Sequence, residues 1–65
     1  MQISVNGEVQ TIGPQSLETY LSDKSLLGRR IAVERNGDIV PKSQFSEVIL
    51  EDGDVLEIVH AIGGG

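Results

Sequence analysis

The chain has 65 residues, no cysteine and a single histidine, so it predicts one small domain without disulfides and without the several ligands of a zinc site. Ten acidic residues against five basic ones give a net charge of −5, which disfavours nucleic acid and anionic membrane surfaces as partners. No stretch is long and apolar enough to span a bilayer, and MQISVNGEV is unlike a secretory signal. Without disulfides, the cytoplasm is the expected location.

The first predicted element is a β-hairpin around Asn6-Gly7. Apolar and polar residues alternate in MQISV and again in EVQTI, and Asn-Gly tolerates the positive φ of a tight turn. A two-residue loop would place Val5 opposite Glu8 and interrupt the apolar face. A three-residue loop through Glu8 places Val5 opposite Val9, so we expect that register.

A short helix is expected after this hairpin. Ser16 is a candidate N-cap, and Gly28 is a candidate stop because glycine adopts the left-handed conformation after a helix without strain. Leu26 and Leu27 are expected to fill the space between helix and sheet. The apolar stripe at i, i+3 and i+4 consists of Leu17, Tyr20 and Leu21.

A second hairpin is expected in IAVERNGDIVP. A two-residue Asn36-Gly37 turn places Arg35 opposite Asp38 and Val33 opposite Val40, which gives an ion pair and an apolar pair.

The rest of the chain predicts a connector and one more strand. Phe45 is expected to anchor a turn into the core, 48–50 to be briefly extended, and EDGD (51–54) to be a solvated turn. VLEIVH is the last strand. Its alternation places Leu56 and Ile58 on one face and Val55, Glu57 and Val59 on the other.

These elements predict an α+β fold. One short helix covers a mixed sheet of about five strands, and the two layers account for nearly every apolar residue. We expect residues 1–60 to form the domain and residues 61–65 to form a flexible C-terminal tail.

No pattern of an active site or metal site is present. His60 has no cysteine to activate, so a structural role is expected for it, and no serine lies in a nucleophile-elbow motif. EDGD lacks the spacing of a calcium loop, and no helix follows the terminal glycines as it would in a phosphate loop. We therefore expect that the protein is not an enzyme and binds no cofactor.

The ending IVHAIGGG suggests a different kind of chemistry. Glycine has no side chain and permits extended and left-handed conformations, so such a tail can enter a narrow channel of another protein. A carboxylate is a poor electrophile until it is joined to the α-phosphate of ATP. On composition alone, however, three terminal glycines are more typical of an inert tail.

Over its whole length the sequence resembles the bacterial sulfur carrier proteins of thiamine biosynthesis, the ThiS family. The stretches that carry the resemblance are MQISVNGE, IAVERNGDIVPKSQF and EDGDVLEIVHAIGGG. The resemblance implies a ubiquitin-like β-grasp fold. It also implies that a partner similar to ubiquitin-activating enzymes uses Mg-ATP to adenylate the carboxylate of Gly65.

The resemblance further implies the remaining steps and partners. A persulfide from a cysteine desulfurase or related donor would convert the adenylate to a thiocarboxylate, and thiazole synthase would accept the sulfur. Gly64, Gly63, Ile62 and Ala61 would thread into the partner, although Ile62 could equally pack on the domain. Val55 and Val59 are candidates for a docking face on the open side of the sheet, with edge packing as the alternative.

Three alternatives remain open at this point. The small subunit of molybdopterin synthase is another β-grasp carrier that ends in Gly-Gly. A ubiquitin-like modifier would use the same activation to attach its C-terminus to lysines of other proteins through an isopeptide bond. A non-covalent interaction domain with an inert tail belongs to a different class.

Overall fold

The computed structural model describes residues 1–61 of the chain. The strands are β1 (Gln2–Val5), β2 (Glu8–Thr11), β3 (Ile31–Arg35), β4 (Asp38–Val40) and β5 (Val55–His60). The helix α1 (Leu17–Asp23) lies between the two hairpins, and a short 3-10 helix, η1 (Lys42–Gln44), lies in the connector to β5.

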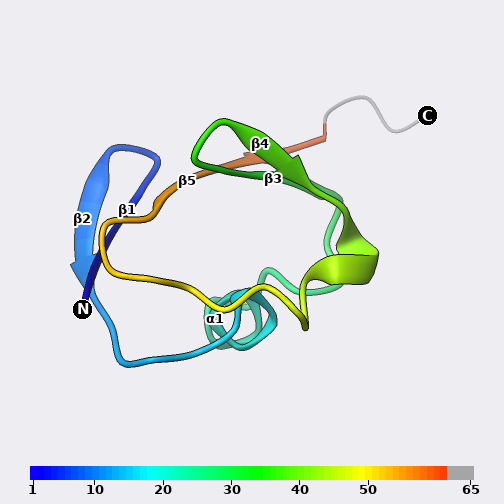
Figure 1. Cartoon of the computed structure of the whole chain (residues 1–65). Helices are drawn as coiled ribbons and strands as arrows, with labels where there is room; N and C mark the ends of the chain where they lie inside the picture. The colour runs from blue at the N-terminus through cyan, green and yellow to red at the C-terminus, as the bar shows by residue number, and fades with distance from the viewer. Residues whose placement is uncertain (62–65) are drawn as a thin grey trace.

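The five strands form one mixed sheet in the order β2-β1-β5-β3-β4. The last strand, β5, lies at the centre, parallel to β1 and antiparallel to β3. The sheet covers one side of α1, and the connector from β4 to β5 passes around the helix (Figure 1). This two-layer arrangement confirms the predicted α+β fold.

The core lies between the sheet and the helix. The predicted stripe of α1 and the predicted inner face of β5 are both fully or nearly fully buried. The buried apolar residues are Ile3, Val5, Leu17, Tyr20, Leu21, Ile31, Val33, Phe45, Leu50, Leu56 and Ile58.

The start of α1 is as predicted, but its end is not. The Ser16 hydroxyl accepts a hydrogen bond from the Thr19 amide, which confirms Ser16 as the N-cap. The helix ends at Asp23, before Gly28, because Ser25 takes the left-handed position at φ 60°. The Leu26 amide then donates to the Leu21 carbonyl, as in a Schellman motif. Leu26 packs against the core as expected, whereas Leu27 is exposed.

The predicted register of the first hairpin is wrong. Val5 lies opposite Glu8, with a two-residue Asn6-Gly7 turn in which both residues have positive φ. We expected an apolar partner for Val5, but β2 is an edge strand whose residues are mostly exposed. Its inward-facing Gln10 accepts a hydrogen bond of 2.7 Å from the Tyr20 hydroxyl, so a polar residue is satisfied there.

The second hairpin has the predicted register: Arg35 lies opposite Asp38 and Val33 opposite Val40. The expected ion pair between Arg35 and Asp38 is wrong, because the guanidinium pairs with Asp54 and Glu51 on the other side of the hairpin strand. Phe45 is buried, as expected for an anchor of the connector. The connector also satisfies the start of α1, since the Phe45 carbonyl accepts a 3.0 Å hydrogen bond from the Glu18 amide. The predicted extended segment at 48–50 is a single antiparallel bridge between Ile49 and Ser16. Within residues 1–61, no helix has the length and apolar character needed to cross a membrane.

Candidate functional site

The sequence directs attention to the end of β5 and the residues that follow it. β5 ends at His60, and the Ala61 amide still donates a 2.9 Å hydrogen bond to the Arg30 carbonyl, so the ladder with β3 reaches one residue beyond the strand. The Ala61 side chain is exposed. Ile62, Gly63, Gly64 and Gly65, which the sequence analysis assigns to a tail, lie outside the described residues. Their roles, and the boundary between 60 and 61, stay predictions.

The two valines predicted to form a docking face both point away from the helix. Val55 is 46% exposed and Val59 is 59% exposed, whereas Leu56 and Ile58, which lie between them in the sequence, are buried. No edge packing covers these valines within residues 1–61. The predicted orientation is confirmed, and their role in docking stays a prediction.

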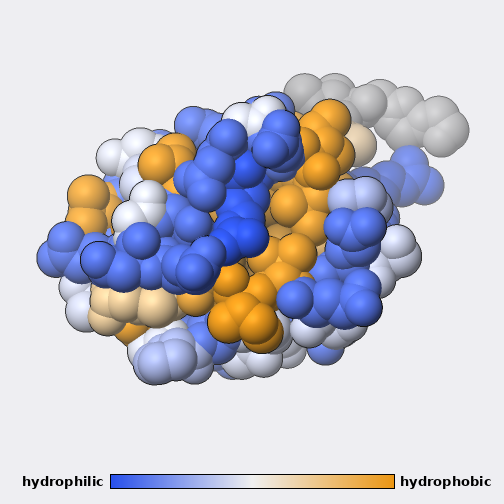
Figure 2. Space-filling model, viewed as in Figure 1, coloured by the Kyte–Doolittle hydropathy of each residue, from blue (hydrophilic) through white to orange (hydrophobic). Residues whose placement is uncertain are grey.

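Two further apolar residues on this face were missed by the sequence analysis. Val9 is 69% exposed and lies opposite Ser4, whose other neighbour is Val55. Ile39 is 71% exposed and lies opposite Glu34. The wrong register of the first hairpin hid Val9, because it placed that residue in the core; simple alternation in DIV would have revealed Ile39. On the side of the molecule seen in Figure 2, apolar surface lies in patches bordered by hydrophilic side chains.

β5 is fixed by the side chains of two asparagines from the hairpin turns. The Asn6 amide group pairs with the backbone of Ile58, donating to its carbonyl at 3.0 Å and accepting from its N–H at 2.7 Å. The Asn36 side chain accepts a 2.9 Å hydrogen bond from the Val55 amide. The two asparagines therefore do more than form the turns. Their side chains make hydrogen bonds to the β5 backbone, one on each side, that the backbone of a neighbouring strand would otherwise make.

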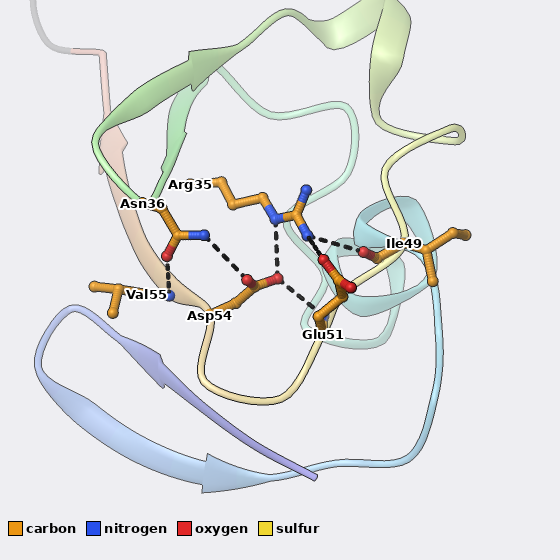
Figure 3. A network of polar contacts seen from close by, with 6 residues as sticks. All are labelled: Arg35, Asn36, Ile49, Glu51, Asp54 and Val55. Atoms are coloured by element: carbon orange, nitrogen blue, oxygen red, sulfur yellow. Dashed lines mark hydrogen bonds and ion pairs between the residues drawn. The ribbon is translucent and has the colours of Figure 1, made fainter.

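The turn before β5 contains a buried carboxylate that the sequence analysis treated as solvated. Asp54 is buried, and its carboxylate accepts hydrogen bonds from the Arg35 Nε at 2.9 Å and from the Asn36 Nδ2 at 3.1 Å. It also accepts a 2.9 Å hydrogen bond from the Glu51 amide. Figure 3 shows these groups converging on Asp54 from the end of β3, the turn that follows it and the turn before β5.

Arginine 35 connects this cluster to the connector. Its Nη2 donates to the Glu51 carboxylate and to the Ile49 carbonyl, both at 3.1 Å. Burial by itself would raise the pKa of the Asp54 carboxyl, but its hydrogen bonds from Glu51, Asn36 and Arg35 and the arginine charge together hold that pKa below its ordinary value. The Asp54 carboxylate is therefore ionised and fully hydrogen-bonded, and its network fixes the position of the start of β5.

The described residues offer no other chemistry of their own. No group of three or more potential metal ligands occurs within residues 1–61. His60 is exposed at the end of β5, where the sequence analysis gave it no catalytic role. The arrangement presents an open sheet face with exposed apolar residues, and its central strand, β5, leads into the glycine-rich end.

Known proteins are similar to this chain in both sequence and fold. The ThiS family model matches residues 2–65. The chain is 42% identical over 50 residues to the sulfur carrier protein ThiS of Bacillus subtilis, an alignment that covers 77% of this chain and 76% of that protein. It is also 44% identical over 66 residues to a thiazole synthase of Paramagnetospirillum magneticum, of which it spans only 20% of the length.

The crystal structure of the thiamine biosynthesis protein ThiS from Geobacter metallireducens superposes on the whole chain with a TM-score of 0.86 and 28% sequence identity, and all of that chain is covered. The likeness confirms the predicted ubiquitin-like β-grasp fold. With a family match over nearly its full length, a carrier relative and this structural neighbour, the chain belongs to the ThiS family.

Proposed function

We propose that the protein is a sulfur carrier that supplies sulfur for the thiazole moiety of thiamine, with the Gly65 carboxylate as the site that carries it. The observation that supports this most strongly is the family match, which extends to residue 65 and therefore includes the glycine-rich end. The identity to a Bacillus subtilis protein named as a sulfur carrier supports the same function. In this role the protein is a co-substrate and not a catalyst.

The proposed chemistry takes place in three steps. A Gly65 carboxylate oxygen attacks the α-phosphorus of ATP and displaces pyrophosphate, which gives an acyl adenylate. The terminal sulfur of a persulfide attacks the activated carbonyl carbon and displaces AMP. A thiol then cleaves the resulting sulfur–sulfur bond, is itself oxidised to a disulfide, and leaves a thiocarboxylate on Gly65. The Mg-ATP belongs to the activating partner.

We assign three partners, all in the cytoplasm. An adenylyltransferase of the ubiquitin-activating type performs the first step, and a cysteine desulfurase or related donor supplies the persulfide. Thiazole synthase accepts the sulfur. Two relatives named thiazole synthase each contain a segment similar to this whole chain, which supports that acceptor.

The geometry of β5 supports the same mode of delivery. Four residues follow Ala61, and four residues reach at most roughly 14 Å when fully extended, so an enzyme that acts on Gly65 must lie against this end of the sheet. Ala61, Ile62, Gly63 and Gly64 would enter its channel, while Val55 and Val59 would contact its surface.

The test is reconstitution with the adenylyltransferase, Mg-ATP, a sulfide or persulfide source and a reducing thiol. Intact-mass spectrometry should reveal replacement of one oxygen by sulfur in the wild-type chain. Deletion of Gly65, or addition of one residue after it, should abolish the product. Failure of the wild-type chain to form a thiocarboxylate would contradict the proposed function. Addition of thiazole synthase and its substrates should then yield the thiazole, whereas transfer only to a pterin precursor would contradict the thiamine assignment.

A further inference from the structure

The centre of the open sheet face holds two acidic side chains directly opposite each other. Glu34 on β3 pairs with Glu57 on β5. In an antiparallel ladder, hydrogen-bonded and non-hydrogen-bonded residue pairs alternate. Two hydrogen-bonded pairs at the ends of the ladder between β3 and β5 are Asn36 with Val55 and Arg30 with Ala61, joined by bonds from the Asn36 amide to the Val55 carbonyl and from the Ala61 amide to the Arg30 carbonyl. By this alternation Glu34 and Glu57 form such a pair, with Cα atoms about 5.5 Å apart. Their side chains leave the sheet on the same face.

This arrangement opposes folding. Like charges directly opposite each other in a sheet repel, and the effect is local to the two strands. Within residues 1–61, neither carboxylate has an ion pair or a side-chain hydrogen bond. The arginine of β3, Arg35, points to the other face and is engaged by Asp54 and Glu51. The free chain therefore keeps an unneutralised pair in the middle of the open face of its sheet.

Apolar residues surround the pair. Val55 and Val59 flank Glu57 at two residues' distance on the same face of β5, and Ile39 lies opposite Glu34 on β4. All three are exposed. A protein surface that covers these side chains removes water from the carboxylates as well, and a cation brought with it then forms stronger charge-assisted hydrogen bonds than it would in water.

The charge selects among the occupants that could cover this face. A second copy of the chain related by a two-fold axis at this point would bring carboxylates onto carboxylates, and the net charge of −5 adds to that repulsion. A partner with a planar cation fits better, because one guanidinium presents enough donors to bond both carboxylates at once.

We infer that Glu34 and Glu57 form a binding site for an arginine side chain of the adenylyltransferase that acts on Gly65, with the apolar residues Val55, Val59 and Ile39 around it. Glu57 lies on the strand that leads into the residues to be modified, so the same partner covers both. The inference rests on the proposed function for the identity of the partner, and it adds the pair as the feature that specifies that partner.

The test compares two double variants with the same change in net charge. Glu34→Gln/Glu57→Gln removes both carboxylates of the pair, and Glu18→Gln/Glu47→Gln removes two exposed carboxylates elsewhere, on α1 and the connector. With the adenylyltransferase, KM for the carrier should rise about tenfold or more in the first variant and little in the second, because a charge pair is lost only in the first. The kcat at saturation should be unchanged, since Gly65 is intact.

Two further measurements keep the outcome decisive. Thermal unfolding should show the first variant to be at least as stable as wild type, which excludes misfolding as the cause. Sedimentation of the wild-type chain should show a monomer; a dimer that is strengthened in Glu34→Gln/Glu57→Gln would identify a second copy as the occupant and overturn the inference. Equal KM values for the two variants would also overturn it. Thiocarboxylate formation by wild type tests the proposed function separately.

Discussion

The Asp54 carboxylate, in the turn before β5, and the carboxylates of Glu34 and Glu57, on β3 and β5, lie on opposite sides of the sheet. Asp54 is buried on the helix side and accepts hydrogen bonds from three different residues. Glu34 and Glu57 face each other on the open side, with no partner within residues 1–61. One set has its charge fully compensated within the chain, and the other does not.

The difference separates a structural role from a recognition role. A buried carboxylate without partners would be costly, so Asp54 requires Arg35 and Asn36 and thereby ties β3 to the start of β5. Carboxylates in water tolerate the lack of a partner at small cost, so Glu34 and Glu57 remain available to another protein. The same residue chemistry thus positions β5 on one side and selects a partner on the other.

The largest expected effect comes from breaking the compensated side. Asp54→Asn keeps the size of the side chain but removes the charge and one acceptor, which leaves a donor of Arg35, Asn36 or Glu51 unpaired. We expect the free energy of unfolding to fall by about 2 kcal/mol in urea titrations near neutral pH. Because small domains have little stability to lose, the midpoint should fall visibly.

Glu51→Gln is the matched control for this substitution. Glu51 bonds the same arginine at 3.1 Å, but its side chain is 77% exposed. Water screens this ion pair, so the loss should stay below about 0.5 kcal/mol. Equal losses for the two variants would show that burial does not separate the members of this network.

Asn6→Gly tests how β5 is held between the two faces. Glycine keeps the positive φ of the turn but removes both hydrogen bonds to Ile58, at an expected cost of about 1 kcal/mol. The Ile58 amide should then exchange its hydrogen roughly tenfold faster, since it loses its acceptor. The Val55 amide, which donates to Asn36, serves as the internal control. Its exchange rate should change only as much as the loss of global stability requires. An unchanged Ile58 rate would contradict the assigned role of Asn6.

The pH dependence of stability should follow Asp54. Its pKa is lower in the folded chain than in the unfolded chain, so its contribution is fully present above the unfolded pKa and is lost as pH falls through the folded pKa. The difference in unfolding free energy between wild type and Asp54→Asn should therefore narrow below about pH 4. Urea titrations across this range measure it, and a constant difference down to acidic pH would contradict the assignment.

The sequence predicts one face of the fold better than the other. Alternation in VLEIVH and the stripe of α1 identify the core, because burial is a periodic property of the chain. The pairing of Val5 with Glu8 was missed because an edge strand need not be apolar, and Tyr20 satisfies the polar Gln10 only through tertiary contact.

Long-range polar contacts account for the other errors. EDGD has the composition of a solvated turn, and only the approach of Arg35 and Asn36 makes Asp54 a buried group. The end of α1 is a local exception: Ser25 takes the left-handed position ahead of Gly28, and the Ser25 and Leu26 amides donate to the Ser22 and Leu21 carbonyls. The facing of Glu34 and Glu57 likewise depends on the β3–β5 register, which pairs strands distant in sequence.

The smallest expected effect is a gain in stability, and it tests the difference between the two sets of carboxylates most directly. Glu34→Gln/Glu57→Gln removes the repulsion across β3 and β5 without leaving any buried group unpaired, so the free energy of unfolding should rise by roughly 0.2–1 kcal/mol. Urea titrations at low salt measure the gain, which should shrink as added salt screens the two charges. Glu18→Gln/Glu47→Gln, with the same change in net charge, should show no such gain. An equal gain in this control would mean that relief of overall negative charge, and not the facing pair, raises stability. A gain specific to the pair, together with weaker partner binding, means that the chain retains an unfavourable contact because its partner uses it.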